Sequence, residues 1–249
     1  MSKRQEIRER HRKEKIRNRI VVIVLVVVGA LLITFALILP SLNTARTASG
    51  ATQTAENTTP LPVVTITPRV FTTKVDGVHL GDPNAPVKVD VYADFRCSAC
   101  LAYVQNIEPQ VIQNYVETGK VYYTYHSFIV IDGNDGTDAS YRSANAAMCA
   151  NEQGHFWDYH DTLYANQITE SADLYTDARL VTMAQNLGLD MTAFNQCFQA
   201  KKYASNIQTD IAQGQSLNVR GTPSIFVDGT FVTSFTEATQ AIDTALVGK

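Results

Sequence analysis

Two cysteines separated by two residues are the side chains of this sequence whose type and spacing best indicate a reaction. Cys97 and Cys100 stand in the tetrapeptide CSAC, shortly after the alternating run Val87–Tyr92 (VKVDVY), which is typical of a strand. Helical spacing of apolar residues begins just beyond Cys97 and predicts a helix there. At such a junction, backbone N–H groups and the helix dipole stabilise a thiolate and lower its pKa. The pattern therefore favours thiol-disulfide exchange.

The positions of the two cysteines predict different roles. Cys97, at the helix start, is the candidate nucleophile, whereas Cys100 lies one turn further on and should be less exposed. From there Cys100 can reach back to Cys97 and resolve a mixed disulfide with a substrate. Asp94 or Asp90 would either accept the proton of Cys100 or be an ordinary strand-end or surface charge, and the sequence leaves both readings open.

Other uses of a CxxC motif fit this sequence less well. Zinc needs further ligands at compatible spacing, but the remaining cysteines, Cys149 and Cys197, are single rather than paired, so we expect no metal. Covalent haem attachment requires His after the second cysteine, where this chain has Leu101. His155 and His160 are five residues apart, which places them on different faces of a helix and favours packing over ligation.

A proline near the C-terminus is the second candidate feature. Thr222 and Pro223 lie in the sequence RGTPSIFV, immediately before a predicted strand. A cis Thr222-Pro223 bond would expose the backbone of Thr222 beside the redox centre, where it can pair with an extended substrate. The alternative is a trans proline that starts an edge strand, and the residues by themselves favour this alternative.

The elements that must position these residues follow an α/β order. A helix should start at or just after Cys97, bend at Pro109 and end before Gly119. The segment from about 139 to 216 lacks strand signals and contains several helical stretches. The predicted strands and the last helix are Val87–Tyr92, Val121–His126, Ser224–Asp228, Thr230–Thr233 and Thr236–Leu246. This order predicts an α/β frame with an inserted helical subdomain.

The N-terminal region indicates a membrane anchor. Residues 1–19 hold nine Lys or Arg and three Asp or Glu, and residues 20–39 form a run of 20 uncharged, mostly apolar residues. Such a run is long enough for one transmembrane helix across a hydrocarbon layer of about 30 Å. The positive charges place the tail 1–19 in the cytoplasm and everything after the span outside it. Whether the anchor is cleaved as a signal peptide stays open.

The remaining composition separates a linker from a folded domain. Residues 40–68 are rich in Thr, Ala, Ser, Asn and Pro, which is typical of a flexible linker, and the folded domain is expected over 69–249. Everything after residue 19 has a formal charge of -9. Nucleic-acid binding is therefore not expected, because phosphate contacts need a basic face on the folded part.

Five motifs in a fixed order carry a family resemblance. They are YADFRCSACLAY, EPQVIQNYVETGKV, CANEQGHFWDYHDTLY, LGLDMTAFNQCF and VRGTPSIFVDG. Together they span about 87 to 233, and the set resembles the membrane-anchored group of the DsbA-like thioredoxin-fold proteins. The resemblance implies a thioredoxin fold with a helical insertion, Cys97 as the attacking cysteine, Cys100 as the resolving cysteine, and a cis Pro223 preceded by Thr222.

The resemblance also implies a use for the other two cysteines. Related proteins of this group often carry a second, structural disulfide, which here would join Cys149 and Cys197. Spacing alone says only that such a bond would close a long loop, and it leaves two buried free thiols as the alternative. A location outside the cytoplasm favours the disulfide.

These observations predict an enzyme of the cell membrane that exchanges disulfides with extracytoplasmic proteins, most simply as an oxidant of secreted or envelope protein thiols. The resemblance implies a quinone-linked membrane partner that restores the cysteine pair, and we expect a monomer without a cofactor. The dipeptide Ser98-Ala99 differs from the Pro-His of well-known oxidases and the Gly-Pro of thioredoxins. A reductase or isomerase, or a non-catalytic peptide-binding module, therefore stays open.

Overall fold

The computed structural model describes residues 61–249. The predicted basic tail 1–19 and the predicted transmembrane helix 20–39 lie outside the described residues, and so does most of the predicted linker 40–68. Within the described part of the chain, every helix is too short or too polar to cross a membrane.

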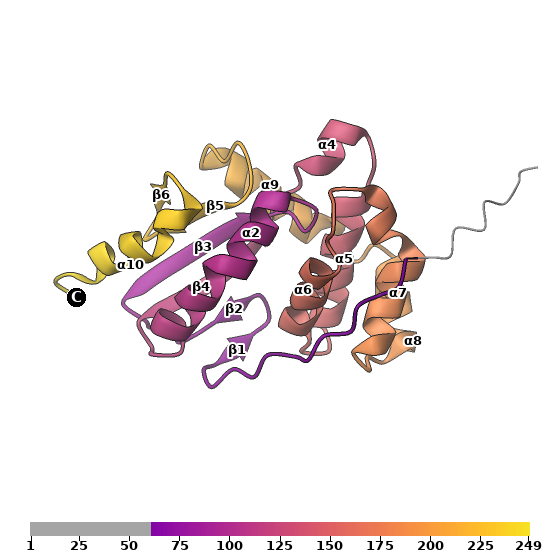
Figure 1. Cartoon of the computed structure of the whole chain (residues 1–249), viewed down its shortest axis with the longest axis horizontal. Helices are drawn as coiled ribbons and strands as arrows, with labels where there is room; N and C mark the ends of the chain where they lie inside the picture. Colours follow the sequence, from indigo (N-terminus) through magenta and orange to yellow (C-terminus); the bar gives the residue numbers. More distant parts are fainter. Residues whose placement is uncertain (1–60) are drawn as a thin grey trace, which may run out of the picture. The chain divides into compact units, whose positions relative to one another are not determined.

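A six-stranded mixed sheet forms the centre of the domain (Figure 1), with strand order β1-β2-β4-β3-β5-β6. The strands are β1 (Val75–Asp76), β2 (His79–Leu80), β3 (Val87–Ala93), β4 (Val121–Ser127), β5 (Ser224–Val227) and β6 (Thr230–Val232). β3 and β4 are parallel, and the other neighbouring pairs are antiparallel. The CxxC follows shortly after β3, which thus lies between β4 and β5.

Helices connect the parallel strands β3 and β4, as a parallel pair requires. They are α2 (Ser98–Asn106), α3 (Glu108–Val111) and the π-helical turn η1 (Ile112–Val116). The prediction of one helix bent at Pro109 is close to the structure, in which the helix is interrupted at Ile107 and Pro109 lies in the first turn of α3. Proline is tolerated in a first turn, where its missing N–H has no intrahelical partner.

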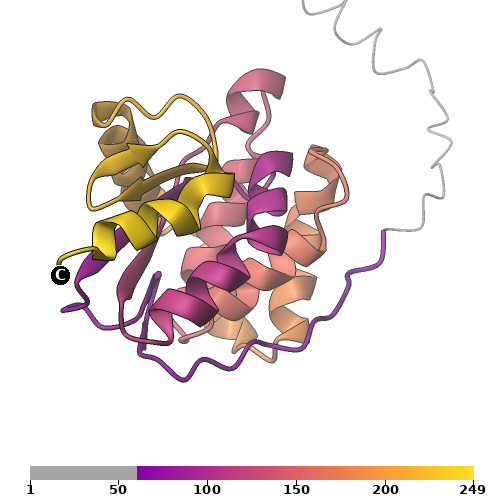
Figure 2. The same cartoon turned by 60° about the vertical axis from the view of Figure 1, so that its left-hand side comes forward.

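The helical insertion lies between β4 and β5. It consists of α4 (Ile131–Asp135), α5 (Ala139–Asn151), α6 (Phe156–Ala165), the 3-10 turn η2 (Ala172–Tyr175), α7 (Asp177–Asn186), α8 (Met191–Gln199) and α9 (Ala204–Ser216). It begins with α4, earlier than the predicted start at about 139. After β6 the chain ends with η3 (Phe235–Glu237) and α10 (Ala238–Leu246). Figures 1 and 2 show α5 to α8 as a group beside the sheet.

Two buried clusters occupy the two faces of the sheet. Val89 and Val91 of β3 belong to the larger cluster, together with Ile242 of α10. Tyr92 points to the opposite face and belongs to a smaller cluster, against which Ile211 of α9 packs. This division follows from the alternation of side chains along a strand. The structure thus has the mixed α/β thioredoxin-like fold with a helical insertion that the sequence predicts.

The described part of the predicted linker contacts the helical insertion. Asn166, at the end of α6, accepts a hydrogen bond from the backbone N–H of Val64 at 2.8 Å and donates one to its carbonyl at 3.0 Å. Arg179 of α7 donates to the carbonyl of Pro62 at 3.3 Å. Residues 61–68 therefore lie along the insertion (Figure 2), although their composition is typical of a linker.

In the insertion, Cys149 of α5 and Cys197 of α8 are joined by a disulfide. Both side chains are buried, and their sequence separation is 48 residues. The bond connects two helices that each belong to the hydrophobic core.

Replacing both Cys149 and Cys197 with Ala should lower the free energy of unfolding by about 4 kcal/mol, because the unfolded chain regains the freedom of a long loop. Urea-induced unfolding of the variant and the parent protein measures this difference. A loss below about 1 kcal/mol would show that the bond adds little to a core that is already complete.

Candidate active site

The CxxC motif lies at the junction of β3 and α2. Cys97 is the N-cap residue of α2, with an extended backbone (φ −71°, ψ 122°), and Ser98 is the first helical residue. The first N–H groups of a helix have no intrahelical acceptor, so those of α2 are available to a group at its start. The Cys97 sulfur is at this position because the strand ends at Ala93 and residues 94–96 lead directly into the helix.

The structure brings four of the predicted site residues together. Cys97 and Cys100 are free thiols; Cys97 is 8% exposed and Cys100 is fully buried. The Cys97 Sγ donates a hydrogen bond to the carbonyl oxygen of Thr222 at 3.2 Å. The Thr222-Pro223 peptide bond is cis. The residues alone favoured a trans bond, and the family resemblance implied the cis form.

The surroundings shift the pKa values of the two thiols in opposite directions. The hydrogen bond from the Cys100 thiol lowers the pKa of Cys97 to about 6. Burial opposes this shift, whereas the side chain of Thr222 and the backbone N–H groups of Cys100 and Ala99 favour it. Burial raises the pKa of Cys100 well above its ordinary value, and the neighbouring Cys97 adds to this shift. At neutral pH the pair therefore holds one thiolate, on the sulfur nearer the surface.

Asp94 holds the segment before Cys97 in place. Asp94 is 1% exposed, and its carboxylate accepts hydrogen bonds from the backbone N–H groups of Arg96 (2.9 Å), Val130 (2.9 Å) and Ile131 (3.0 Å). The first alternative for Asp94, a proton acceptor for Cys100, is therefore less well supported than a structural role, because three backbone donors already use the carboxylate.

Asp90 and His126 lie together on the other face of the sheet. His126 Nε2 is 2.9 Å from Asp90 Oδ1, and its Nδ1 is 3.4 Å from Asp210 Oδ1. Burial lowers the pKa of His126, but the hydrogen bonds to Asp210 and Asp90 outweigh this effect and raise it to about 9. His126 is thus a cation paired with two carboxylates, and Asp90 has a partner other than Cys100.

Arg96, which was not among the predicted site residues, connects the residues before the redox motif to the helical insertion. Its side chain is fully buried, and its guanidinium donates to Asp132 (2.9 Å), to Thr137 (2.8 Å), to Asp135 and to the carbonyl of Glu170 (3.0 Å). A buried charge is tolerated only when it is paired and hydrogen-bonded, as this one is. The only sequence signal was a charged residue directly before the motif.

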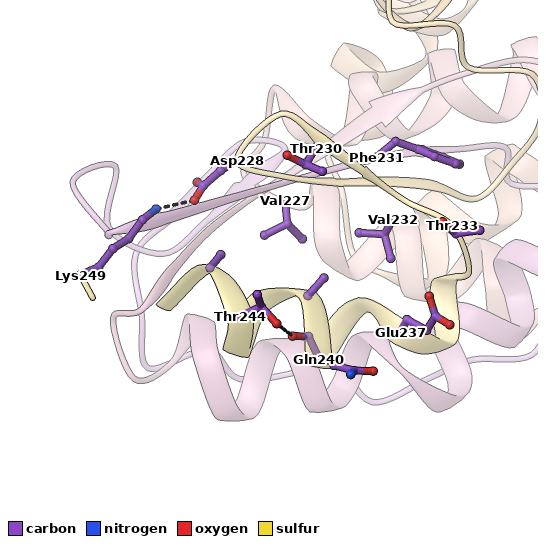
Figure 3. A pocket seen from close by; sticks show the side chains of 12 residues that line it. Val227, Asp228, Thr230, Phe231, Val232, Thr233, Glu237, Gln240, Thr244 and Lys249 are labelled. Atoms are coloured by element: carbon purple, nitrogen blue, oxygen red, sulfur yellow. Dashed lines mark hydrogen bonds and ion pairs between the residues drawn. The ribbon is translucent and has the colours of Figure 1, made fainter. Parts of the chain in front are cut away.

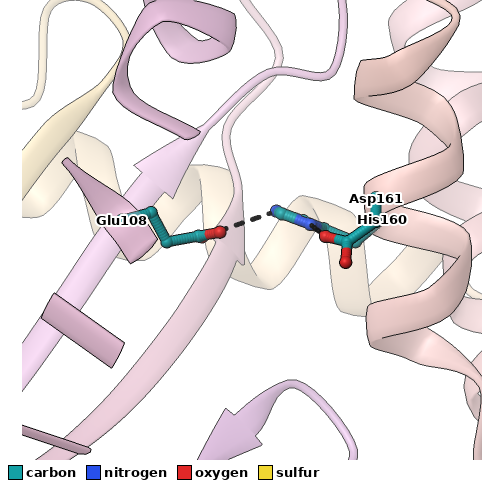
Figure 4. A group of neighbouring side chains, drawn as sticks. All are labelled: Glu108, His160 and Asp161. Carbon is teal, nitrogen blue, oxygen red and sulfur yellow. Dashed lines mark hydrogen bonds and ion pairs between the residues drawn. The ribbon is translucent and has the colours of Figure 1, made fainter. Parts of the chain in front are cut away.

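A second buried polar group surrounds His160 (Figure 4). His160 Nδ1 is 2.9 Å from Asp161, and its Nε2 is 3.8 Å from Glu108. Ligand atoms of these three residues lie within 4.8 Å of one another, as in a metal site. However, the Arg69 guanidinium pairs with Glu108 at 3.2 Å and with Asp161 at 2.5 Å, so it supplies the positive charge that a metal ion would bring. We interpret the group as an ion network within the core.

A groove of about 700 Å³ lies between β6 and α10 (Figure 3). Phe231 and Val232 line one side, and Gln240 and Thr244 of α10 line the other. All its lining residues come from the range 227–249, which contains none of the four cysteines. The groove is therefore separate from the redox motif.

Comparisons with known proteins agree with the fold. A family model described as thioredoxin matches residues 73–244. The chain belongs to the thioredoxin family. This match includes the CxxC, the helical insertion and the proline before β5.

Relatives of this thioredoxin-family chain carry names that state a reaction. It is 28% identical over 172 residues to a protein of Bacillus anthracis named probable disulfide bond formation protein D, covering 67% of this chain and 77% of the relative. It is 23% identical over 174 residues to disulfide bond formation protein D of Bacillus subtilis, covering 68% and 77%. The chain is a DsbA-like protein thiol-disulfide oxidoreductase.

A solved structure shares the fold. The crystal structure of oxidised BdbD from Bacillus subtilis superimposes with a TM-score of 0.62 and 22% sequence identity, covering 72% of this chain and 97% of that chain. The shared region includes most of the described residues, so the helical insertion belongs to the common architecture.

The thiolate of Cys97 should be visible as a pH-dependent reactivity. With a pKa of about 6, Cys97 should react with iodoacetamide at a rate that rises with pH and reaches half its maximum near pH 6. Alkylation followed by mass spectrometry of the reduced protein measures this profile, and Cys100→Ala, which removes the side-chain donor, should shift the midpoint upward. A midpoint between 8 and 9 in the parent protein, as in a free cysteine, would contradict the described environment.

Proposed function

We propose that this oxidoreductase forms disulfides in secreted or envelope proteins, with Cys97 as the attacking and Cys100 as the resolving cysteine. The observation that carries the proposal is the lowered pKa of Cys97 at the start of α2, beside a fully buried Cys100. A stabilised thiolate favours the reduced form of the pair, and a pair whose reduced form is favoured is an oxidant toward other thiols.

The reaction begins from the Cys97-Cys100 disulfide. A substrate thiolate attacks the Cys97 sulfur; the bond between Cys97 and Cys100 breaks, and Cys100 leaves and takes up a proton, as its raised pKa favours. A second substrate thiolate then attacks the substrate sulfur of the mixed disulfide and expels Cys97 as a thiolate. Two electrons pass from the substrate to the cysteine pair, and the low pKa of Cys97 makes it a good leaving group.

We also propose that the substrate backbone binds next to Thr222 and Pro223. Both residues are half-buried and lie directly before β5, and the carbonyl of Thr222 is 3.2 Å from the Cys97 sulfur. An extended peptide that pairs with the backbone of Thr222 would bring its cysteine to Cys97 without contacts specific to one sequence. Such binding suits an enzyme that oxidises many different proteins.

The location and the recycling partner belong to the same proposal. The apolar run 20–39 and the basic tail before it support a single membrane span with the catalytic domain outside the cytoplasm. The disulfide between Cys149 and Cys197 supports an oxidising compartment. A quinone-linked membrane protein would then accept the two electrons from the reduced pair, while the enzyme itself acts as a monomer.

A reductase or isomerase is the second candidate, and the pKa of Cys97 favours it in one respect. The value of about 6 lies closer to the roughly 7 of thioredoxin than to the roughly 3.5 of the strong oxidant DsbA. The pair would then be a weaker oxidant than DsbA, and its direction of electron flow would depend on its partner.

Trapping of mixed disulfides tests the roles of the two cysteines. Cys100→Ser removes the resolving thiol, so the variant should accumulate mixed disulfides between Cys97 and substrate proteins, visible on non-reducing gels of cells that express it. Cys97→Ser is the matched control and should trap at least tenfold less. Equal trapping by both variants would overturn the assigned roles, and full function of Cys97→Ser in cells would favour a non-catalytic peptide-binding module.

A further inference from the structure

A carboxylate from the helical insertion contacts the first residue of the redox helix. Glu170 lies in the loop between α6 and η2, and its Oε1 accepts hydrogen bonds from the backbone N–H of Ser98 at 3.1 Å and from the Ser98 hydroxyl at 2.8 Å. Ser98 directly follows Cys97 and is the first helical residue of α2. The N-terminus of α2 stabilises the Cys97 thiolate, and Glu170 places a negative charge beside this N-terminus.

The loop is fixed in this position by a buried cation. Arg96 donates to the backbone carbonyl of Glu170 through Nε at 3.0 Å and through Nη2. A second contact comes from Gln167, whose side-chain amide donates to the carbonyl of Arg96 at 2.7 Å. The same residue that precedes the CxxC thus holds the loop that carries Glu170, and the contact between Glu170 and Ser98 follows from this arrangement.

The Glu170 carboxylate is ionised at neutral pH. Hydrogen bonds from the N–H and the hydroxyl of Ser98 lower its pKa, and Arg96 adds to the shift. Arg96 compensates little of this negative charge, because its guanidinium is already paired with Asp132 at 2.9 Å and with Asp135. This network therefore holds one cation, Arg96, against the three carboxylates of Asp132, Asp135 and Glu170, and its net charge is negative.

We propose that Glu170 is a positioning residue that makes the Cys97-Cys100 pair a weaker oxidant than the start of α2 alone would make it. It acts through Ser98, whose N–H it occupies, and through its charge, which opposes the thiolate formed when the pair is reduced. The inference rests on the proposed redox role of Cys97 and Cys100. In this proposal the helical insertion, and not only the dipeptide between the cysteines, sets the redox potential of the pair.

The experiment compares Glu170→Gln with the parent protein in glutathione buffers. Gln keeps the hydrogen-bond acceptor and removes the charge, so the equilibrium constant for oxidation of glutathione by the cysteine pair should rise about two- to fivefold, the range of a single charge near a helix end. The midpoint of Cys97 alkylation should move to lower pH in the same variant. Asp173→Asn is the matched control, because it removes one exposed negative charge nearby without a side-chain contact to α2, and it should change neither value.

The outcomes separate this inference from the proposed function. If the parent pair fails to titrate with glutathione, the redox role itself is wrong. If the parent pair titrates and Glu170→Gln matches it in both measurements, only the role of Glu170 is overturned. Equal shifts in Glu170→Gln and Asp173→Asn would also overturn it, since they would show a general charge effect rather than one exerted through Ser98.

Discussion

The placement of one sulfur at the start of a helix is the constraint on which the rest of the structure depends. Cys97 must sit where β3 ends and α2 begins, and it must also meet the carbonyl of Thr222, which is 125 residues away along the chain. The antiparallel pairing of β3 with β5 satisfies both conditions, because it brings the end of the first strand next to the start of the second. The sheet is thus the element that turns two distant sequence motifs into one site.

Around this centre the protein uses buried polar groups as structural contacts rather than as reactants. The carboxylate of Asp94 accepts hydrogen bonds from three backbone N–H groups, and Arg96, the residue before Cys97, connects α4 to the Glu170 loop. Each buried charge has partners, as the cost of burial requires. These contacts fix the surroundings of the two cysteines. The Cys97 thiolate near the surface and the fully buried Cys100 thiol therefore differ in pKa, although they are one helical turn apart.

Local patterns explain which parts of this arrangement could be predicted. The alternation of β3, the CxxC and the helical spacing after it are neighbours in sequence, so the junction that creates the site was predictable. The hairpin of β1 and β2 was missed, since each strand has two residues and shows no period; the Asp76-Gly77 turn was its only signal. The contacts of Glu170 with Arg96 and with Ser98 join residues more than 70 positions apart, and no local pattern encodes such a pairing. The cis form of Pro223 came from the family resemblance, not from the residues.

The redox potential of the Cys97-Cys100 pair tests the central claim most directly. It would be measured by equilibrating the protein in glutathione buffers, with the Cys149-Cys197 disulfide left intact. A thiolate stabilised to a pKa of about 6 predicts a potential clearly above the roughly −270 mV of thioredoxin and below the roughly −120 mV of DsbA. A potential at or below that of thioredoxin would contradict the account, because it would mean that the start of α2 does not favour the reduced pair.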